Sequence, residues 1–209
     1  MRQIIKKVIR EVLNEQNEVL LAPNGNESNL PKSLYEYVRT DDFKSWFGDW
    51  ENNPNNSSKI VDENGEPMLV FHGTEKEFQD FNKEDLRFNY FYFTVDENYA
   101  KHFGKVKGCF LNVRKLKDMK KAGVAPITSN QLFKFLGFKD STYEFFYKKR
   151  KFWDFFRLSD EIYRVLKWNN YDCVNFFEDF DEDGATDKTE VFAVFNSNQI
   201  KCIGKNKTY

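Results

Sequence analysis

The chain contains only two histidines, His72 and His102, so few of its side chains can exchange protons near neutral pH. His72 ends the apolar segment Leu69–Phe71, and Gly73 follows it directly. An imidazole at a strand end can hydrogen-bond a sugar hydroxyl, and a glycine beside it lets a flat ligand approach the backbone closely. Taken alone, this pair is more typical of a strand that simply ends in a turn.

The sequence offers little material for other kinds of catalytic site. His102 falls in a short predicted helix, where we expect it to face solvent or to be partly packed. No Ser/His/Asp or Cys/His arrangement is evident, and neither a GxGxxG nor a Walker motif occurs. Three cysteines lie far apart without metal-binding spacing, so we expect no metal site and free thiols at Cys109, Cys173 and Cys202.

The composition is that of a soluble globular chain. Of its 209 residues, 40% are hydrophobic and 31% charged, and the 23 phenylalanines favour a substantial β component. A net charge of −1 gives no overall basic excess, so nucleic acid is not indicated as a partner, although a local patch is not excluded. No apolar run spans a membrane and the charged N-terminus lacks a signal peptide's apolar core, which predicts a cytoplasmic protein without a membrane partner.

Three parts of the chain differ in composition. Residues 1–16 carry apolar side chains at three- and four-residue steps, which predicts an amphipathic helix that docks on its own domain or on a partner. Residues 17–32 are rich in Asn, Glu, Ser, Gly and Pro and are predicted to be a linker. The folded domain is then expected over residues 33–209, with a helical insertion at 129–169.

Within this domain, hydrophobic patterning places several strands and a short helix around His72. Asn64-Gly65 is a strong hairpin-turn dipeptide, and it predicts a hairpin between Lys59–Val61 and Met68–His72. An aromatic strand is expected at Tyr90–Thr94, followed by a helix over Asp96–Phe103. Later strands are predicted at Gly108–Val113, Cys173–Phe177 and Val191–Phe195.

Four segments, in this order, resemble ADP-ribosyltransferases of the diphtheria-toxin and poly(ADP-ribose)-polymerase type: VDENGEPMLVFHGT, FYFTVDENYAKHFG, CFLNVRK and VFAVFNSNQIK. The resemblance is closest to the domains of phage and mobile-element polyvalent proteins, in which the lead-in FKSWFGDW also recurs. It covers roughly residues 33–204. It implies an α+β fold in which two small, mostly antiparallel sheets pack face to face with helices around them.

The resemblance also implies a site for NAD as co-substrate, with a role for each matching residue. His72 would hydrogen-bond the adenosine-side ribose, and the backbone of Gly73 would hold the nicotinamide carboxamide. Tyr92 would stack against the nicotinamide ring, which suits a flat aromatic group with one amide. The further NAD-binding residues that it implies are Thr74, Phe93, Ala100 and Phe103, of which Phe103 would stack on the opposite ring face.

The catalytic acid departs from the family pattern. The family's glutamate stands four residues before an aromatic and eight before a glutamine, and counting back from Phe195 and Gln199 places Val191 there. Glu190 lies one residue early, so its side chain would face away from the pocket unless a bulge turns it inward. Three hypotheses follow. Glu190 is catalytic because a bulge turns it inward, or the three motif residues are His72, Tyr92 and Val191 and the enzyme relies on an acid from the target or elsewhere. In the third hypothesis the site is degenerate and carries out no chemistry.

The resemblance implies a function that follows from this site. The chain would be a mono-ADP-ribosyltransferase that moves ADP-ribose from NAD to a macromolecule, by default a host protein, and releases nicotinamide. Such a toxin-like effector, delivered by a phage or mobile element, would act in the host cytoplasm. Two alternatives remain: an NAD glycohydrolase, in which water replaces the acceptor, and a degenerate module that binds NAD, ADP-ribose or a protein without chemistry.

Overall fold

A computed structural model describes the protein over residues 19–75, 80–82, 89–123, 125, 127–137, 160–179 and 188–204. The predicted helix at 1–16 and the middle of the predicted helical insertion, 138–159, lie outside the described residues. The described part contains five α-helices and seven strands, which confirms the α+β class. The helices are α2 (Lys32–Val38), α3 (Asp41–Phe47), α4 (Glu97–Lys101), α5 (Ser129–Leu136) and α7 (Asp160–Trp168).

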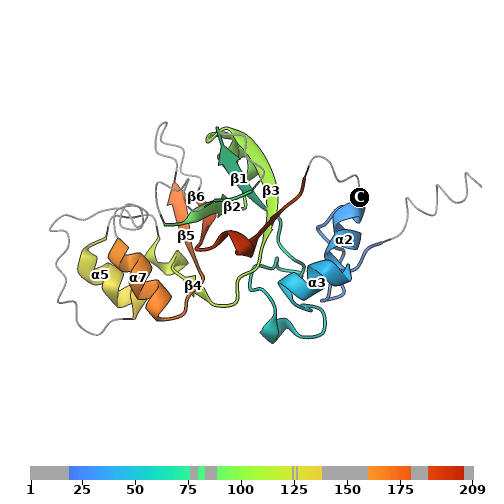
Figure 1. Ribbon diagram of the computed structural model, residues 1–209, viewed down its shortest axis with the longest axis horizontal. Helices are drawn as coiled ribbons and strands as arrows, with labels where there is room; N and C mark the ends of the chain where they lie inside the picture. Colours follow the sequence, from blue (N-terminus) through green and yellow to red (C-terminus); the bar gives the residue numbers. More distant parts are fainter. Residues whose placement is uncertain are drawn as a thin grey trace, which may run out of the picture.

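All seven strands belong to one hydrogen-bonded sheet, in the order β4-β5-β6-β2-β1-β3-β7 (Figure 1). Every pairing is antiparallel except that of β4 with β5, which is parallel. The strands are β1 (Val70–Thr74), β2 (Phe91–Thr94), β3 (Lys105–Leu111), β4 (Leu116–Asp118), β5 (Cys173–Asp179), β6 (Lys188–Val194) and β7 (Ile200–Cys202).

The expectation of two separate sheets packed face to face is therefore wrong. The single sheet has two parts, β4-β5-β6-β2 and β1-β3-β7, which meet between β1 and β2. Phe71↔Thr94 is the one registered pair that joins these two strands, whereas β1 and β3 share five. The sheet is continuous but weakly joined at its centre, because so few ladder hydrogen bonds can form there.

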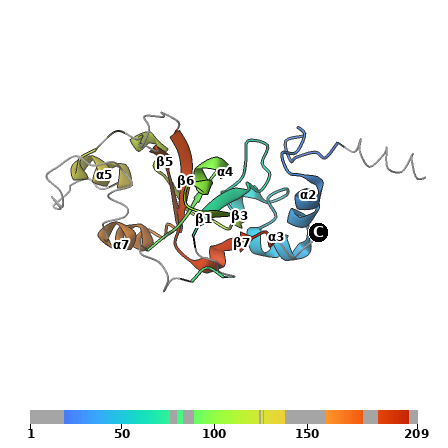
Figure 2. The same cartoon turned by 90° about the horizontal axis from the view of Figure 1, so that it is seen from above.

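Helices cover different parts of the sheet. Helices α5 and α7 lie together beside the β5 and β6 half, and α2 and α3 lie at the opposite end of the molecule (Figures 1 and 2). Leu132 of α5 and Ile162 of α7 are buried in a core that includes Phe176 of β5 and Val191 of β6. A second core covers the other face of the same strands and includes Phe91, Phe93, Phe192 and Val194.

Helix α3 packs aromatic residues against the sheet. The Thr40 hydroxyl accepts a hydrogen bond from the Phe43 amide and thereby caps the N-terminus of α3. Phe43 and Phe47 are fully buried, and the rings of Phe43 and Phe110 lie 5.2 Å apart in an edge-on arrangement. The aromatic segment Phe43–Trp50 thereby packs against Phe110 of β3.

The predicted hairpin before β1 is confirmed. Val61 and Pro67 form an antiparallel bridge, and the Met68 amide donates to the Ile60 carbonyl. Gly65 has a φ of +83°, in the region that the Asn-Gly turn dipeptide predicts. Regular strand pairing begins only at Val70, so the hairpin arms are short.

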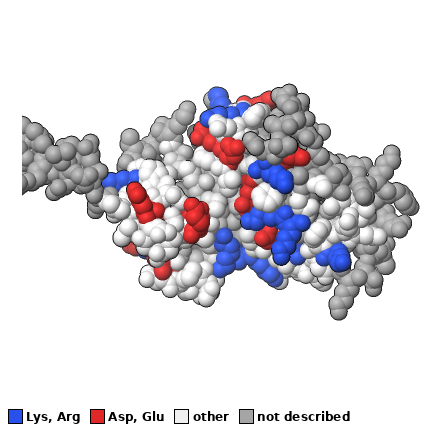
Figure 3. Space-filling view, turned by 180° about the vertical axis from the view of Figure 1, so that it is seen from behind, with Lys and Arg blue, Asp and Glu red and all other residues white. Residues whose placement is uncertain are grey.

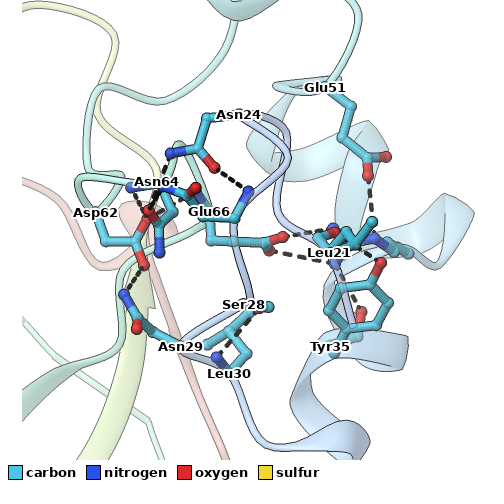
Figure 4. A network of polar contacts seen from close by, with 12 residues as sticks. Leu21, Asn24, Ser28, Asn29, Leu30, Tyr35, Glu51, Asp62, Asn64 and Glu66 are labelled. Atoms are coloured by element: carbon cyan, nitrogen blue, oxygen red, sulfur yellow. Dashed lines mark hydrogen bonds and ion pairs between the residues drawn. The ribbon is translucent and has the colours of Figure 1, made fainter. Parts of the chain in front are cut away.

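Part of the stretch predicted as a linker is packed against this hairpin. Ala22 and Leu30 are buried, and the Asn24 amide donates to the Asn64 side chain at 2.9 Å. Figure 4 shows Asn24 and Asn64 beside the buried Glu66. The Glu66 carboxylate binds the Arg39 guanidinium at 2.5 Å. The described residues from Val19 onward therefore follow the surface of the domain rather than leaving it.

Two of the three cysteines are bonded, so the expectation of free thiols is wrong for this pair. Cys109 of β3 and Cys202 of β7 face each other in the strand register and form a disulfide. Spacing in the sequence gave no sign of this pairing, because 93 residues separate the two positions. Cys173 is free and buried, and burial raises the pKa of its thiol. None of the helices in the described ranges is both long and apolar enough to cross a membrane.

Candidate active site

The strands β1 and β2 separate where His72 follows Phe71. His72 Nδ1 lies 2.8 Å from the Tyr92 carbonyl oxygen, so the imidazole bonds a backbone group that a continuing ladder would have used. A carbonyl only accepts hydrogen bonds, which means that Nδ1 donates and that Nε2 of the neutral ring is an acceptor. An acceptor at Nε2 suits a sugar hydroxyl. The side chain thus both opens the sheet and presents a polar atom there.

The surroundings of His72 keep its imidazole neutral. Burial has the largest effect and lowers the pKa of His72 below its usual 6.5, and the nearby Lys107 acts in the same direction. The hydrogen bond to the Tyr92 carbonyl opposes them. The ring is also held by aromatic neighbours, with centroids 5.0 Å from Phe81 and 5.4 Å from Phe93. The imidazole is therefore a fixed, uncharged hydrogen-bonding group.

Helix α4 lies against β1 (Figure 2). It begins at Asp96, whose carboxylate accepts hydrogen bonds from the Asn98 and Tyr99 amides. A Cβ atom built on Gly73 would lie 1.9 Å from the Ala100 carbonyl oxygen, so only glycine lets the helix approach this closely. Gly73 was predicted to contact a ligand, and in the structure it also allows α4 to pack closely on β1.

One pocket of about 430 Å³ lies at this junction, within the range of roughly 300–1,000 Å³ that small-molecule sites occupy. The residues around it come from β1, β2, α4 and the strands β5 and β6. Six of the residues predicted for NAD binding or catalysis are among them. The lining consists of Phe71, His72, Gly73, Tyr92, Phe93, Thr94, Tyr99, Ala100, Phe103, Glu178 and Val191.

Two of the predicted site residues lie elsewhere. Thr74 ends β1, where it pairs with Lys105 of β3, and it does not line the pocket. Glu190 is also outside the lining, whereas its neighbour Val191 is part of it. The structure thus brings the predicted histidine, tyrosine and glycine together without the predicted acid.

Strand register explains the position of Glu190. Strands β5 and β6 pair without interruption from Cys173↔Val194 to Asp179↔Lys188, so β6 contains no bulge. Successive side chains of a regular strand point to opposite faces, and Glu190 therefore points away from the face that carries Val191. Its carboxylate accepts from the Asn175 amide at 2.7 Å and binds the Lys120 ammonium at 3.1 Å.

Glu178 is the one acidic residue in the pocket lining, and it was not among the site residues predicted from the sequence. The alternation of side chains along β5 could have indicated this residue. Val174, Phe176 and Glu178 occupy one face of the strand, and the first two are core residues. A glutamate in phase with buried apolar residues is unusual, because ionisable groups are seldom fully buried. Glu178 is only 7% exposed.

The chemistry of the lining fits a nucleotide with a flat ring. Aromatic side chains form much of the wall, which suits stacking, and His72 and Glu178 supply a hydrogen-bond acceptor and a carboxylate. Nowhere in the described ranges do three His, Cys, Asp or Glu side chains gather as potential metal ligands.

The fold and this pocket define an α+β domain with a nucleotide-type site in a split sheet. A model of the family described as "ADP-Ribosyltransferase in polyvalent proteins" matches residues 62–209, which include every residue of the pocket lining. The chain belongs to this family of ADP-ribosyltransferases, as the sequence motifs predicted. Membership implies NAD as the substrate and a mobile-element setting. A search of curated proteins finds no match.

Proposed function

We propose that the protein transfers ADP-ribose from NAD to a macromolecular acceptor and releases nicotinamide. The observation that carries this proposal is the convergence of the family's motif residues in one pocket. His72 and Gly73 of β1 lie beside Tyr92 of β2 and Ala100 of α4, although up to 28 positions separate them in the sequence. Such convergence supports the roles that the family resemblance implies.

In this proposal, the aromatic wall holds the nicotinamide ring. Tyr92 and Phe103 stack on its two faces, and each stack contributes on the order of 0.5–1.5 kcal/mol beyond area burial. The Gly73 backbone pairs with the carboxamide, and His72 Nε2 accepts a hydrogen bond from a ribose hydroxyl. The pocket therefore leaves the ribose C1′ atom open to attack by an acceptor.

The proposed acceptor is a host protein. On the face seen in Figure 3, Lys and Arg side chains gather near the centre with Asp and Glu beside them. A uniformly basic stripe is typical of nucleic-acid binding, and this face mixes both signs instead. Water at the same carbon would give an NAD glycohydrolase, so the acceptor decides between the two enzyme activities.

The test uses NAD labelled on its adenine side, with and without bacterial lysate, and follows both free nicotinamide and label on macromolecules. The variant His72→Asn keeps an amide that can donate to the Tyr92 carbonyl but removes Nε2. The matched control is His102→Asn, because His102 does not line the pocket.

Label on macromolecules that His72→Asn abolishes and His102→Asn preserves is the expected result. Nicotinamide release without such label, in several lysates, would identify a glycohydrolase. Absence of release, together with NAD binding in a calorimetric titration, would refute the transferase and favour a binding module.

A further inference from the structure

The carboxylate in the pocket comes from a different strand than the family motif implies. We propose that Glu178 of β5 supplies the catalytic carboxylate, in place of a glutamate at the motif position on β6. This inference rests on the proposed function, since it concerns the same reaction in the same pocket. It replaces the prediction for Glu190 with a residue whose position follows from the sheet.

Strand pairing places Glu178 next to the motif position. Val191, which occupies that position, pairs with Phe176 of β5, and Glu178 is the next residue along β5 on the same face. Such diagonal neighbours in antiparallel strands are about 7–8 Å apart, which is within reach of a long side chain. A glutamate on β5 can therefore direct its carboxylate toward the place where a glutamate at 191 would act.

The residues beside Glu178 fix this corner of the sheet. Thr189, its partner on β6, shares a hydrogen bond of 2.7 Å with Thr94 of β2, and both hydroxyls are buried. Thr94 in turn pairs with Val191 and lines the pocket. This hydrogen bond and the strand pairing tie β2, β6 and β5 together beside Glu178.

Glu190 is held elsewhere by its own contacts. It would have to leave the Asn175 amide and the Lys120 ammonium, and β6 would have to gain a bulge, before its carboxylate reached the pocket. Exchanging two hydrogen-bonded partners for a new backbone conformation is unfavourable. Glu178 already lines the pocket from a regularly paired strand.

The chemistry requires an anion in this position. As the bond between ribose C1′ and the nicotinamide nitrogen breaks, its electron pair leaves with nicotinamide and positive charge develops on the ribose. The Glu178 carboxylate stabilises that charge, and removing one such electrostatic contact typically lowers a rate by about 10²–10³-fold. The acceptor then bonds to C1′, and its proton passes to Glu178.

The experiment compares Glu178→Gln with Glu190→Gln in the full chain. Both variants keep side-chain size and remove one charge, on opposite faces of the same pair of strands. Three quantities are measured for each: nicotinamide release from NAD, NAD affinity by calorimetry, and the unfolding midpoint. We expect Glu178→Gln to lower release by about 10²–10³-fold, with NAD affinity changed less than tenfold. Glu190→Gln should keep the rate of release.

A pH profile separates a catalytic role from a structural one. The wild-type rate should fall at acidic pH as both Glu178 and His72 are protonated, and Glu178→Gln should keep only the part of that decline that protonation of His72 causes. If Glu178→Gln does not fold, Glu178→Asp takes its place, because it keeps the charge but withdraws it by one methylene. Folded Glu178→Asp should bind NAD and release nicotinamide more slowly.

Three results would overturn the proposal. If Glu178→Gln folds and releases nicotinamide at the wild-type rate, this carboxylate is not catalytic. The same conclusion follows if only Glu190→Gln loses nicotinamide release. A wild-type protein that binds NAD but never releases nicotinamide refutes the transferase itself, and the catalytic role of Glu178 with it. The first two results leave the proposed function standing, so the two failures are distinguishable.

Discussion

The contact between β1 and α4 makes a sharp prediction for Gly73→Ala. The added Cβ would lie 1.9 Å from the Ala100 carbonyl oxygen and 2.9 Å from the Phe103 Cβ, whereas nonbonded carbon contacts are comfortable at about 3.5–4.0 Å. The obstructing atoms include backbone, so relief requires α4 to move away from β1 rather than a side chain to rotate. Helix α4 carries Tyr99 and Ala100 of the pocket lining, and Phe103 follows it closely, so displacement of the helix should also weaken NAD binding.

The magnitude follows from the cost of overpacking. Inserting a methyl group into a well-packed site costs about 1–3 kcal/mol, and occasionally more. We therefore expect Gly73→Ala to lower the free energy of unfolding by at least that amount and to raise the dissociation constant for NAD.

The matched control is Gly108→Ala on the adjacent strand β3. A Cβ at Gly108 would meet only side-chain atoms, at 3.4 Å from Leu69 Cδ1, 3.6 Å from Ile203 Cδ1 and 3.9 Å from Phe71 Cε1. Replacing a glycine where the backbone tolerates alanine stabilises by about 0.4–1 kcal/mol, because the unfolded chain loses freedom. The two substitutions should thus change stability in opposite directions.

Urea unfolding measures both stabilities, and calorimetry measures NAD binding by the same two variants. A Gly73→Ala protein as stable as Gly108→Ala, with unchanged NAD affinity, would refute the close packing of α4 on β1. It would also remove the packing explanation for glycine at this position.

Other predictions concern charge and disulfide chemistry. Because burial lowers the folded-state pKa of His72 below 6.5, its contribution to stability is complete above about pH 6.5 and is lost as pH falls toward the folded-state pKa, by at most about 1.4 kcal/mol per pH unit. Urea unfolding between pH 7.5 and 5.5 should therefore show that the free energy of unfolding depends less on pH in His72→Asn than in the wild type. An equal pH dependence in the two proteins would contradict the lowered pKa of His72. Arg39→Met should lower the free energy of unfolding by about 3–5 kcal/mol, because it leaves the fully buried Glu66 carboxylate without its cation. Adding Glu66→Gln should recover part of that loss, whereas a decrease below about 1 kcal/mol for Arg39→Met alone would show that the pair is not buried. The unfolded protein should titrate one thiol without reductant and three after reduction, and three thiols in both samples would exclude the bond between Cys109 and Cys202.

The elements around the site were predictable because their signals are local. Asn64-Gly65 predicted the hairpin that leads into β1, and Asp96 predicted the start of α4. The apolar segments Cys173–Phe177 and Val191–Phe195 predicted two strands, and in the structure the first continues to Asp179 and the second runs from Lys188 to Val194. Each of these patterns depends on a few neighbouring residues, so no knowledge of the rest of the fold is needed.

Local patterns could not predict how the strands pair. A single sheet replaced the two expected sheets because β1 and β2 keep one registered pair, Phe71↔Thr94, before the strands separate. Whether two strands separate depends on a side chain reaching across to a distant carbonyl, as His72 does to Tyr92. The disulfide between Cys109 and Cys202 likewise depends on the register of β3 with β7.

The sequence by itself determined the order of the motifs, and with it the family, the histidine and the aromatic residues of the pocket. Tertiary structure decided which acid accompanies them, because a one-residue difference in strand position selects the opposite face of a sheet. Glu190 is closer to the motif in sequence, but Glu178 lines the pocket from a neighbouring strand. Sequence specifies side-chain chemistry and local conformation, whereas the register of strands distant along the chain sets which side chains meet.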